Sequence, residues 1–346
     1  MRPRLLIVGA SGRAAAASAI RAGFDPFVID LFADADTQRL CPVLKCDPAD
    51  YPHGFIPLAE QAPASPWMYT GGLENHPEVV EAISQKRELF GFGPDQLKGM
   101  RDPFRMGEFI HHLPNGRTCN VRAGNDPPPA GRPWLRKPLR SSCGFGIRPA
   151  LHFEPDSDAH YYQEFIAGES HSLLMDGQRI LGTTRQLIGT PWLHASAFRY
   201  AGNAFHPNKP FAESGETSSP WLSKSWGIDF IATDSGNVLI EINPRYTAAM
   251  ELLELPCDGF IAKAIYFAPH AFAFPDSGPW EDSLARCTDV WKLHDFADIP
   301  HPFAHVEAGQ PVITIFTQGD TEADCLESLQ RRAAELDRLF GWENSP

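Results

Sequence analysis

Residues 1–90 alternate short apolar runs with segments of helical character. Residues 5–8 predict a buried strand, and the turn Gly9-Ala-Ser-Gly12 follows it directly. An alanine-rich stretch predicts a helix that ends near Gly23, and a second strand follows. A strand, a helix and a strand in this order are typical of a doubly wound parallel sheet. The predicted elements after the first helix are strands at residues 27–31, 55–58 and 66–70 and a helix at residues 75–89.

From residue 91 the pattern changes to short apolar segments that are separated by turns. Asp176-Gly177 and Asp234-Ser-Gly236-Asn each connect two predicted strands as a tight hairpin turn. The predicted strands are at residues 134–138, 161–166, 171–175, 178–181, 227–232, 238–242 and 312–316. The predicted helices are at residues 102–113, from near Ala248, and at 322–339, where apolar residues recur at helical spacing.

The composition is that of a folded, acidic protein. Hydrophobic residues make up 43% of the chain and charged residues 21%, and the formal net charge is −13. This charge disfavours broad contact with nucleic acid or anionic lipid, although local basic clusters could still bind phosphates. The seven cysteines contain no Cys-x-x-Cys pair, which argues against a zinc or disulfide framework and favours the cytoplasm. No apolar run reaches the roughly 18 residues of a membrane-spanning helix, and homo-oligomerisation is left open.

The hairpin predicted at residues 227–242 carries the strongest chemical signal. Asp229 lies in its first strand, and Glu241 and Asn243 lie at the end of its second. A spacing of two places Glu241 and Asn243 on one face, and pairing across the turn brings Asp229 near them. Oxygen ligands on adjacent strands suit Mg²⁺. The alternative interpretation is a surface hairpin whose polar face is in water. Arg245 follows the strand end, where it is placed to hold phosphoryl oxygens.

A second segment joins a strand lysine to a loop of small residues. Lys137 is the lysine, and the loop after it contains Ser141, Ser142, Gly144 and Gly146. Free backbone N–H groups beside a lysine hold phosphate groups in many proteins. The order of residues differs from that of a P-loop, and a flexible surface loop is the alternative.

A third segment is a strand that ends in a glycine turn and an acidic residue. It contains Gln163, Glu164, Phe165 and Ile166, and Glu169 follows the turn. The backbone of residues 164–166 is a candidate to read an adenine edge, and Glu169 is a candidate to accept ribose hydroxyls. A plain strand with a polar exit is the alternative.

The order of these three segments resembles the ATP-grasp superfamily of carboxylate–amine ligases over about residues 1–270. Glu241-Ile-Asn-Pro-Arg245 with the upstream Asp229 is the most specific part of the resemblance. The resemblance implies an α/β protein with the ATP-grasp fold, in which two α+β subdomains grip ATP. The domains it implies are a Rossmann-like pre-ATP-grasp domain at residues 1–90, an ATP-grasp domain at 91–275 with a lid at about 115–165, and a small α/β segment at 276–346.

The resemblance also implies roles for the candidate residues. Lys137 would contact nucleotide phosphates, and the loop at residues 141–147 would cover them. Members of the superfamily usually carry another phosphate-binding lysine before the lid. Here the stretch Lys98-Gly-Met-Arg101 occupies that position, and Arg101 or Lys98 would substitute.

The remaining implied roles concern the base, the ribose and the metal. Residues 163–166 would line the adenine pocket, and Glu169 would bind the ribose. The three oxygen donors of the hairpin would hold Mg²⁺, with Mn²⁺ as the alternative ion. Arg245 would face the γ-phosphate of ATP and the acyl phosphate made from it.

The activity implied is an ATP-dependent ligation of a carboxylate to an amine, with an acyl phosphate as intermediate and release of ADP and phosphate. The layout is similar to the branch that contains tyramine–glutamate ligase and the pyrrolysine-pathway ligase. That branch implies glutamate or another amino acid as the carboxylate. It also implies a place in the synthesis of a furan-type one-carbon carrier.

Three other interpretations remain open from the sequence. The first is an NAD-dependent oxidoreductase, which is indicated by Gly9-Ala-Ser-Gly12 with Asp30 at the end of the second strand. The full dinucleotide-binding pattern is absent. A non-catalytic nucleotide-binding regulatory protein and a carboxylase that uses carboxyphosphate are the others. Arg185 and Arg199 are candidates to hold a substrate carboxylate.

Overall fold

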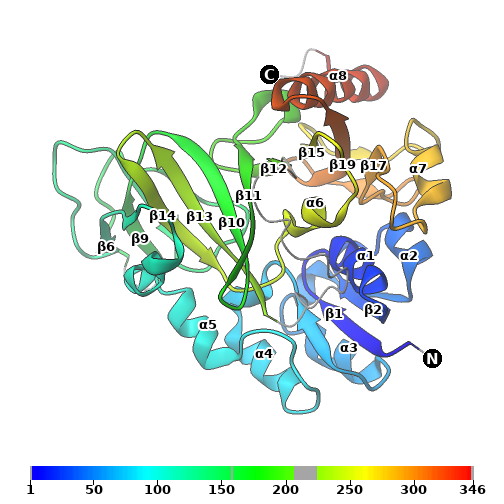
Figure 1. The fold of residues 1–346 in the computed structure, drawn as a ribbon, viewed down its shortest axis with the longest axis horizontal. Coiled ribbons are helices and arrows are strands. Elements are labelled where there is room, and N and C mark those ends of the chain that lie inside the picture. The colour runs from blue at the N-terminus through cyan, green and yellow to red at the C-terminus, as the bar shows by residue number, and fades with distance from the viewer. Residues whose placement is uncertain (1, 157–158, 206–223, 344–346) are drawn as a thin grey trace.

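The computed structural model describes residues 2–156, 159–205 and 224–343. Figure 1 shows a parallel α/β unit at the lower right, a large twisted sheet in the centre, a small sheet at the far left and a C-terminal helix at the top. The candidate residues lie on the central and small sheets and on the segments between them and the N-terminal unit.

The N-terminal unit is a four-stranded parallel sheet in the order β3-β2-β1-β4. The apolar run of the first strand is buried from Leu5 to Val8, because helices cover the sheet. The predicted doubly wound opening is therefore present. The elements of this unit are β1 (Arg4–Val8), α1 (Arg13–Arg21), β2 (Asp25–Asp30), α2 (Ala35–Leu40), β3 (Val43–Lys45), η1 (Pro48–Asp50), α3 (Phe55–Gln61), β4 (Trp67–Tyr69), η2 (Leu73–Asn75) and α4 (Pro77–Ser84).

The central sheet has nine strands in the order β17-β19-β15-β12-β11-β10-β13-β14-β5. Its two predicted hairpins are confirmed, since β10 pairs with β11 and β13 pairs with β14, both antiparallel. The strands of this sheet up to residue 267, with the helices between them, are α5 (Pro94–Met100), η3 (Met106–His112), β5 (Gly116–Thr118), β10 (Glu169–Asp176), β11 (Arg179–Ile188), η4 (Pro191–Leu193), β12 (Tyr200–Phe205), β13 (Ser225–Thr233), β14 (Gly236–Asn243), α6 (Met250–Glu254) and β15 (Phe260–Phe267).

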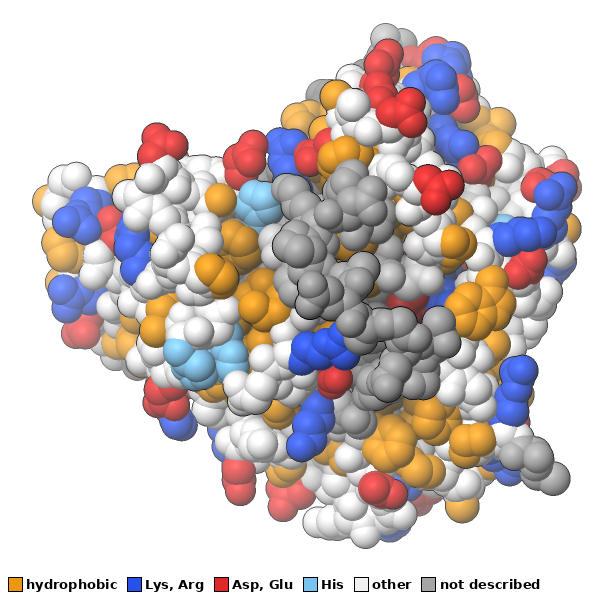
Figure 2. Space-filling view, in the orientation of Figure 1, with side chains coloured by type: hydrophobic (Ala, Val, Ile, Leu, Met, Phe, Trp, Pro, Cys, Tyr) orange, Lys and Arg blue, Asp and Glu red, His pale blue; other side chains and the backbone are white. Residues whose placement is uncertain are grey.

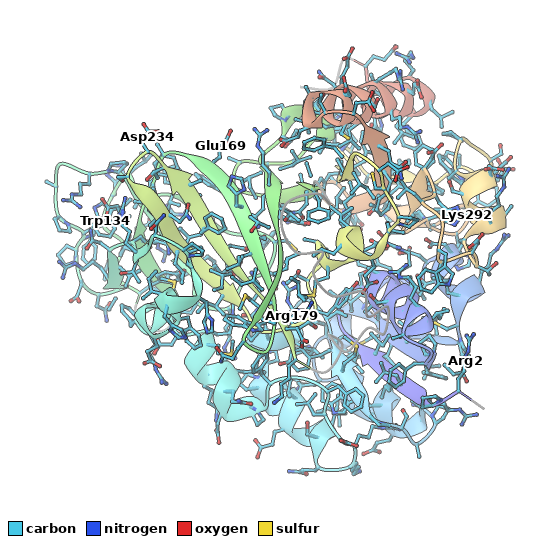
Figure 3. All side chains as sticks on the ribbon, viewed as in Figure 1. Arg2, Trp134, Glu169, Arg179, Asp234 and Lys292 are labelled. Carbon is cyan, nitrogen blue, oxygen red and sulfur yellow. The ribbon has the colours of Figure 1, made fainter. Side chains whose placement is uncertain are left out.

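The small sheet is antiparallel and has the order β6-β9-β7-β8. It lies beside strand β14 of the central sheet in Figure 1, and Trp134 of β7 is labelled in it in Figure 3. Its strands are β6 (Val121–Ala123), β7 (Trp134–Pro138), β8 (Arg148–Pro149) and β9 (His160–Glu164). Lys137 of β7 and Gln163 of β9 therefore come from the same sheet.

The C-terminal segment completes the central sheet and covers one of its faces. α8 packs its buried residues Leu329, Ala333 and Leu336 against the core that contains Tyr266. Thr321 and Asp324 form a capping box at its start, so the predicted tail helix is confirmed. The elements are β16 (Phe272–Ala273), α7 (Glu281–Arg286), β17 (Phe296–Ala297), β18 (His305–Val306), β19 (Pro311–Gly319) and α8 (Glu322–Phe340).

The strand predicted at residues 55–58 is wrong, because this segment is the start of helix α3. Phe55 and Ala59 are its buried residues, and they lie four apart on one helical face. Pro57 falls in the first turn, where a missing N–H breaks no intrahelical hydrogen bond. The short apolar run did not distinguish a strand from a helix.

Two predicted helices differ in extent from those observed. The helix predicted at residues 75–89 ends at Ser84, because Leu89 instead forms a parallel bridge with Trp67. The prediction of one helix at residues 102–113 is wrong: α5 ends at Met100, and the segment contains the 3-10 helix η3 instead. Pro103 disfavours helical backbone at the residue before it, which separates the two.

Figure 2 shows acidic and basic side chains interspersed over the described residues of this face, so the net negative charge is spread rather than gathered into one patch there. Within the described residues, no helix has the length and apolarity needed to cross a bilayer.

A buried ion cluster joins the N-terminal unit to the rest of the protein. Arg13, the first residue of α1, donates from Nη2 to Glu251 Oε2 at 2.8 Å and from Nε to Asp298 Oδ1 at 2.8 Å. Lys263 Nζ lies 3.1 Å from the same Glu251 carboxylate. Arg13, Glu251 and Lys263 are all buried. Because a buried charge is costly without its partner, the cluster fixes how the three parts of the chain meet.

We expect Glu251→Gln to lower the free energy of unfolding by about 3–5 kcal/mol, since it leaves Arg13 and Lys263 without their shared carboxylate. Urea denaturation measures the change. Glu60→Gln is the control, because the Lys86–Glu60 pair is exposed on both sides and contributes about 1 kcal/mol or less. Similar small changes in the two variants would contradict the importance of the buried cluster.

We also expect stability to depend on pH through Asp36. Burial raises the pKa of Asp36 to about 6, against the lowering effect of Arg13. An aspartate has a pKa of about 4 in the unfolded chain, so its contribution to stability is full below about pH 4 and is lost as pH rises towards 6. In urea titrations, Asp36→Asn should flatten the fall in stability between about pH 4 and 6. Identical slopes in the variant and the wild type would contradict this.

Candidate active site

The β13–β14 hairpin brings the three predicted oxygen donors together. Asp229 lies directly opposite Glu241 in the strand register, and Asn243 follows two residues later on the same face. Asn243 Nδ2 donates to Asp229 Oδ2 at 2.9 Å, and Ser172 Oγ of β10 donates to Asp229 Oδ1 at 2.6 Å. The amide oxygen of Asn243 is therefore turned away from Asp229, towards Arg245.

The hairpin face presents two carboxylates whose pKa values are shifted in opposite directions. Burial and, after it, the Glu241 carboxylate raise the pKa of Asp229 to about 6. Burial also acts to raise the pKa of Glu241, but Arg101 and Lys137 lower it overall. Two carboxylates and one amide oxygen form a donor set that Mg²⁺ accepts. Among the described residues no group of three or more His, Cys, Asp or Glu is arranged to hold a metal, so Asn243 and ligand oxygens would complete the shell.

Three cations meet at this hairpin: two come from outside it, and the third follows its second strand. Arg101 Nη1, just after α5, donates to Glu241 Oε1 at 2.7 Å, and Lys137 Nζ of β7 lies 3.9 Å from Glu241 Oε2. Arg245 Nη2 donates to Asn243 Oδ1 at 3.3 Å. Although burial alone lowers the pKa of Lys137, Tyr161 and Glu241 raise it overall, so the ammonium stays charged. These cations are matched to anionic oxygens of the kind that phosphate groups carry.

The structure brings Arg101 and not Lys98 to this point. Lys98 is largely exposed and pairs with Asp95 at 3.3 Å within α5. Arg101 also donates from Nη1 to the Ile242 carbonyl at 2.9 Å and from Nη2 to Asn75 Oδ1 at 3.0 Å. Of the two candidates, Arg101 is therefore the one that contacts Glu241.

The loop at residues 141–147 lies over the junction of these elements. The Ser141 carbonyl accepts from Asn75 Nδ2 at 3.0 Å, and Ser142 Oγ accepts from the same nitrogen at 3.2 Å. On its other side, the backbone of Gly144 lies so close to the Phe198 carbonyl that a Cβ would come within 1.9 Å of its oxygen. Gly144 and Gly146 both have positive φ, of 75° and 76°. The glycines therefore permit the loop to pack tightly against the segment before β12.

The predicted base-binding segment divides into two parts. Gln163 is buried with Lys137: its Oε1 accepts from Lys137 Nζ at 3.0 Å and its Nε2 donates to the Ile240 carbonyl at 2.9 Å. Glu164 pairs with Arg132 at 2.9 Å. Gln163 thus orients the lysine, and Glu164 points away from it.

The end of this segment is more open. Phe165 is 40% exposed, and its N–H donates to the Pro133 carbonyl at 3.0 Å. A base would therefore meet the carbonyl groups or the Ile166 amide rather than the Phe165 amide. Glu169 is exposed at the start of β10. It lies at the same end of these strands as Asp234, which is in the β13–β14 turn (Figure 3). Its position there is separate from the Lys137 and Glu241 cluster.

The sequence analysis missed two residues of the site, Glu74 and Asn75. Glu74 Oε1 accepts from Arg245 Nε at 2.8 Å, and Asn75 contacts the loop and Arg101 as described above. Both follow the glycine pair at residues 71–72, just after strand β4. Polar residues at the carboxyl end of a parallel strand are a known signal of a ligand site, and that signal was present.

The N-terminal glycine turn is engaged within the protein. The Gly12 N–H donates to Asp30 Oδ2 at 2.9 Å, and the Ala10 N–H donates to the Gly71 carbonyl at 2.9 Å. Asp30 therefore occupies the helix start that a dinucleotide phosphate would need. This contact argues against the NAD-dependent interpretation.

Comparisons with known proteins agree with this geometry. Residues 118–249 match the family model for the ATP-grasp domain. An uncharacterized protein of Methanocaldococcus jannaschii is 25% identical over 291 residues, which cover 77% of this chain and 68% of that protein.

Three solved structures have a similar fold over most of the chain. N5-carboxyaminoimidazole ribonucleotide synthetase from Thermus thermophilus has 14% identity and a TM-score of 0.60, over 97% of this chain and 98% of that one. The biotin carboxylase domain of Hydrogenobacter thermophilus 2-oxoglutarate carboxylase, in complex with MgADP and bicarbonate, has 11% identity and a TM-score of 0.63, over 97% and 90%. L-amino acid ligase from Bacillus licheniformis has 12% identity and a TM-score of 0.60, over 97% and 98%. The predicted ATP-grasp fold with an N-terminal Rossmann-like sheet is confirmed.

We expect Asp229→Asn to weaken the binding of ADP in the presence of Mg²⁺ by about tenfold or more, since it removes one of two carboxylate ligands. Calorimetric titration with and without Mg²⁺ measures this. Asp234→Asn is the matched control, because Asp234 is exposed in the turn of the same hairpin. If ADP binding depends on Mg²⁺ equally in Asp229→Asn and the wild type, Asp229 is not a ligand.

Proposed function

We propose that this ATP-grasp superfamily protein is an ADP-forming ligase that uses ATP and Mg²⁺ to join a small-molecule carboxylate to an amine through an acyl phosphate. One observation carries the proposal: Arg101, Lys137 and Arg245 converge on the face that carries Asp229, Glu241 and Asn243. Such a set of cations and oxygen donors suits the transfer of a phosphoryl group, where the protein positions reactants and neutralises charge.

Each residue has a chemical part in this proposal. Asp229, Glu241 and Asn243 would hold Mg²⁺, which supplies charge neutralisation for the phosphate oxygens when bound. Lys137 and Arg101 would bind phosphate oxygens of ATP. Arg245 would hold the γ-phosphoryl group as the substrate carboxylate attacks it, and then the acyl phosphate that results.

The loop with Ser141, Ser142, Gly144 and Gly146 would cover the bound phosphates. An acyl phosphate is readily hydrolysed, so the site must exclude water once it has formed. The loop contacts Asn75 of the N-terminal unit on one side and the segment that precedes β12 on the other. Both contacts support its role as a cover. Residues 163–166 and Glu169 remain the proposed contacts for adenine and ribose.

The substrates are proposed at a finer level. An amino acid such as glutamate as the carboxylate, and tyramine or a related amine as the acceptor, would place the reaction in the synthesis of a furan-type one-carbon carrier in the cytoplasm. The fold shared with L-amino acid ligase is compatible with an amino acid substrate. The guanidinium of Arg199 lies over the rings of Phe145 and Phe267, and its Nε is buried without a hydrogen-bond partner among the described residues. Arg199 is therefore the better of the two candidates for holding the substrate carboxylate, since Arg185 pairs with Glu322.

The test is Mg²⁺-dependent ATP turnover with each of the twenty amino acids and with hydroxylamine, which traps an acyl phosphate as a hydroxamate. The wild type should release ADP and form a hydroxamate with at least one amino acid. Lys137→Ala and Arg101→Ala should lower kcat/KM for ATP by about 100-fold or more, since each removes a preorganised phosphate contact.

Lys98→Ala is the matched control and should stay within about twofold of the wild type, because Lys98 is exposed and pairs with Asp95. A separate reaction with bicarbonate and no amino acid tests the carboxylase alternative. Absence of both ATP binding and turnover in the wild type would contradict the proposed function.

A further inference from the structure

The side chain of Glu74 is buried at the candidate site with half of its carboxylate unused. Glu74 is 2% exposed. Its Oε1 accepts from Arg245 Nε at 2.8 Å and from Ser142 Oγ at 3.4 Å. Its Oε2 is buried and has no hydrogen-bond partner among the residues that the structure describes. A buried carboxylate oxygen without a donor is costly, so it marks a position where a donor from a ligand would be favourable.

Glu74 lies one side chain away from the proposed reaction centre. Arg245 bridges it to Asn243 Oδ1, and Asn243 in turn donates to Asp229. A group bound at Glu74 Oε2 would therefore lie beside the guanidinium proposed to hold the acyl phosphate.

Two cations, Arg245 and Arg101, act on Glu74, but among the described residues neither donates to Oε2. Burial and, after it, the Glu74 carboxylate raise the pKa of Tyr51 to about 12, so the nearby phenol is neutral at physiological pH. Gly72 has a φ of 100°, and a Cβ there would come within 2.5 Å of the Tyr51 hydroxyl. Arg245 is the basic residue that pairs with Glu74 among the described residues. An ammonium group has several N–H donors and the charge that a carboxylate prefers.

We propose that Glu74 receives the amine substrate of the ligase and accepts its proton. This inference rests on the proposed function and names the residue that would contact the second substrate. The incoming ammonium transfers one proton to Glu74 Oε2 and becomes a neutral amine. The amine nitrogen then forms the C–N bond with the acyl carbon, the C–O bond to phosphate breaks, and the departing phosphate takes the second N–H proton.

The competing explanation is that Glu74 only positions Arg245. The two roles predict different defects, because Arg245 serves acyl phosphate formation whereas an amine-binding residue serves only the step after it. Hydroxylamine separates the steps, since it is uncharged at neutral pH and captures the acyl phosphate without an ammonium site.

The experiment compares the wild type with Glu74→Gln and Glu74→Asp. Glutamine keeps the size and an oxygen for Arg245 but removes the charge, and aspartate keeps the charge. Hydroxamate formation is measured with the amino acid that the turnover screen identifies. Amide formation is measured with tyramine, ammonium chloride and each amino acid as the amine. Glu78→Gln, an exposed change of the same kind in α4, is the control.

We expect Glu74→Gln to lower kcat/KM for the amine by about 100-fold, as for loss of a general base, and to lower hydroxamate formation far less, so that the ratio of amide to hydroxamate falls. Glu74→Asp should recover at least a tenth of the ratio of amide to hydroxamate. Equal loss of both activities in Glu74→Gln overturns the inference and leaves Glu74 as a positioning residue for Arg245. Unchanged amide formation also overturns it. Absence of any hydroxamate with the wild type overturns the proposed function itself, and this inference with it.

Discussion

The opposition of two half-buried carboxylates, Asp229 and Glu241, is the constraint on which the site depends. Neighbouring strands hold them opposite each other, and burial and, after it, the Glu241 carboxylate raise the pKa of Asp229. Neighbouring cations lower the pKa of Glu241 and so keep its carboxylate ionised. Two of these cations come from outside the hairpin: Lys137 lies in the small sheet, and Arg101 lies just after α5. The third, Arg245, follows the end of β14. The meeting of separate units at this point is thus an electrostatic requirement.

A continuous row of polar residues extends this site across the central sheet. The strand register places Asp229 opposite Ser172, Ser172 opposite Thr184, and Asn203 opposite Lys263. Directly opposed residues share a face, and Asn203 Nδ2 donates to Thr184 Oγ1 at 2.8 Å. The row therefore runs from the candidate metal ligands to the buried ion cluster around Arg13. The same face that presents the chemistry also fixes the N-terminal unit, which contributes Glu74 and Asn75.

Much of the hairpin and of the fold was predictable from local pattern. The period of a strand determines that Glu241 and Asn243 share a face, and the tight turn determines that Asp229 lies opposite. Residues 5–8 and the tail helix carry equally direct periodic signals. The strand expected at residues 55–58 was wrong, since an apolar run of that length fits a helix with one buried face as well as a strand.

The sequence by itself therefore determined the hairpin donors, the lysine with its glycine loop and the α/β opening, because each depends on residues close together in the chain. Only the tertiary structure shows that Arg101 contacts Glu241 whereas Lys98 is exposed and pairs with Asp95. It also assigned Gln163 to orient Lys137, and it brought Glu74 to Arg245 across 171 residues of sequence. These contacts depend on how separate sheets pack, and no spacing within one segment contains that information.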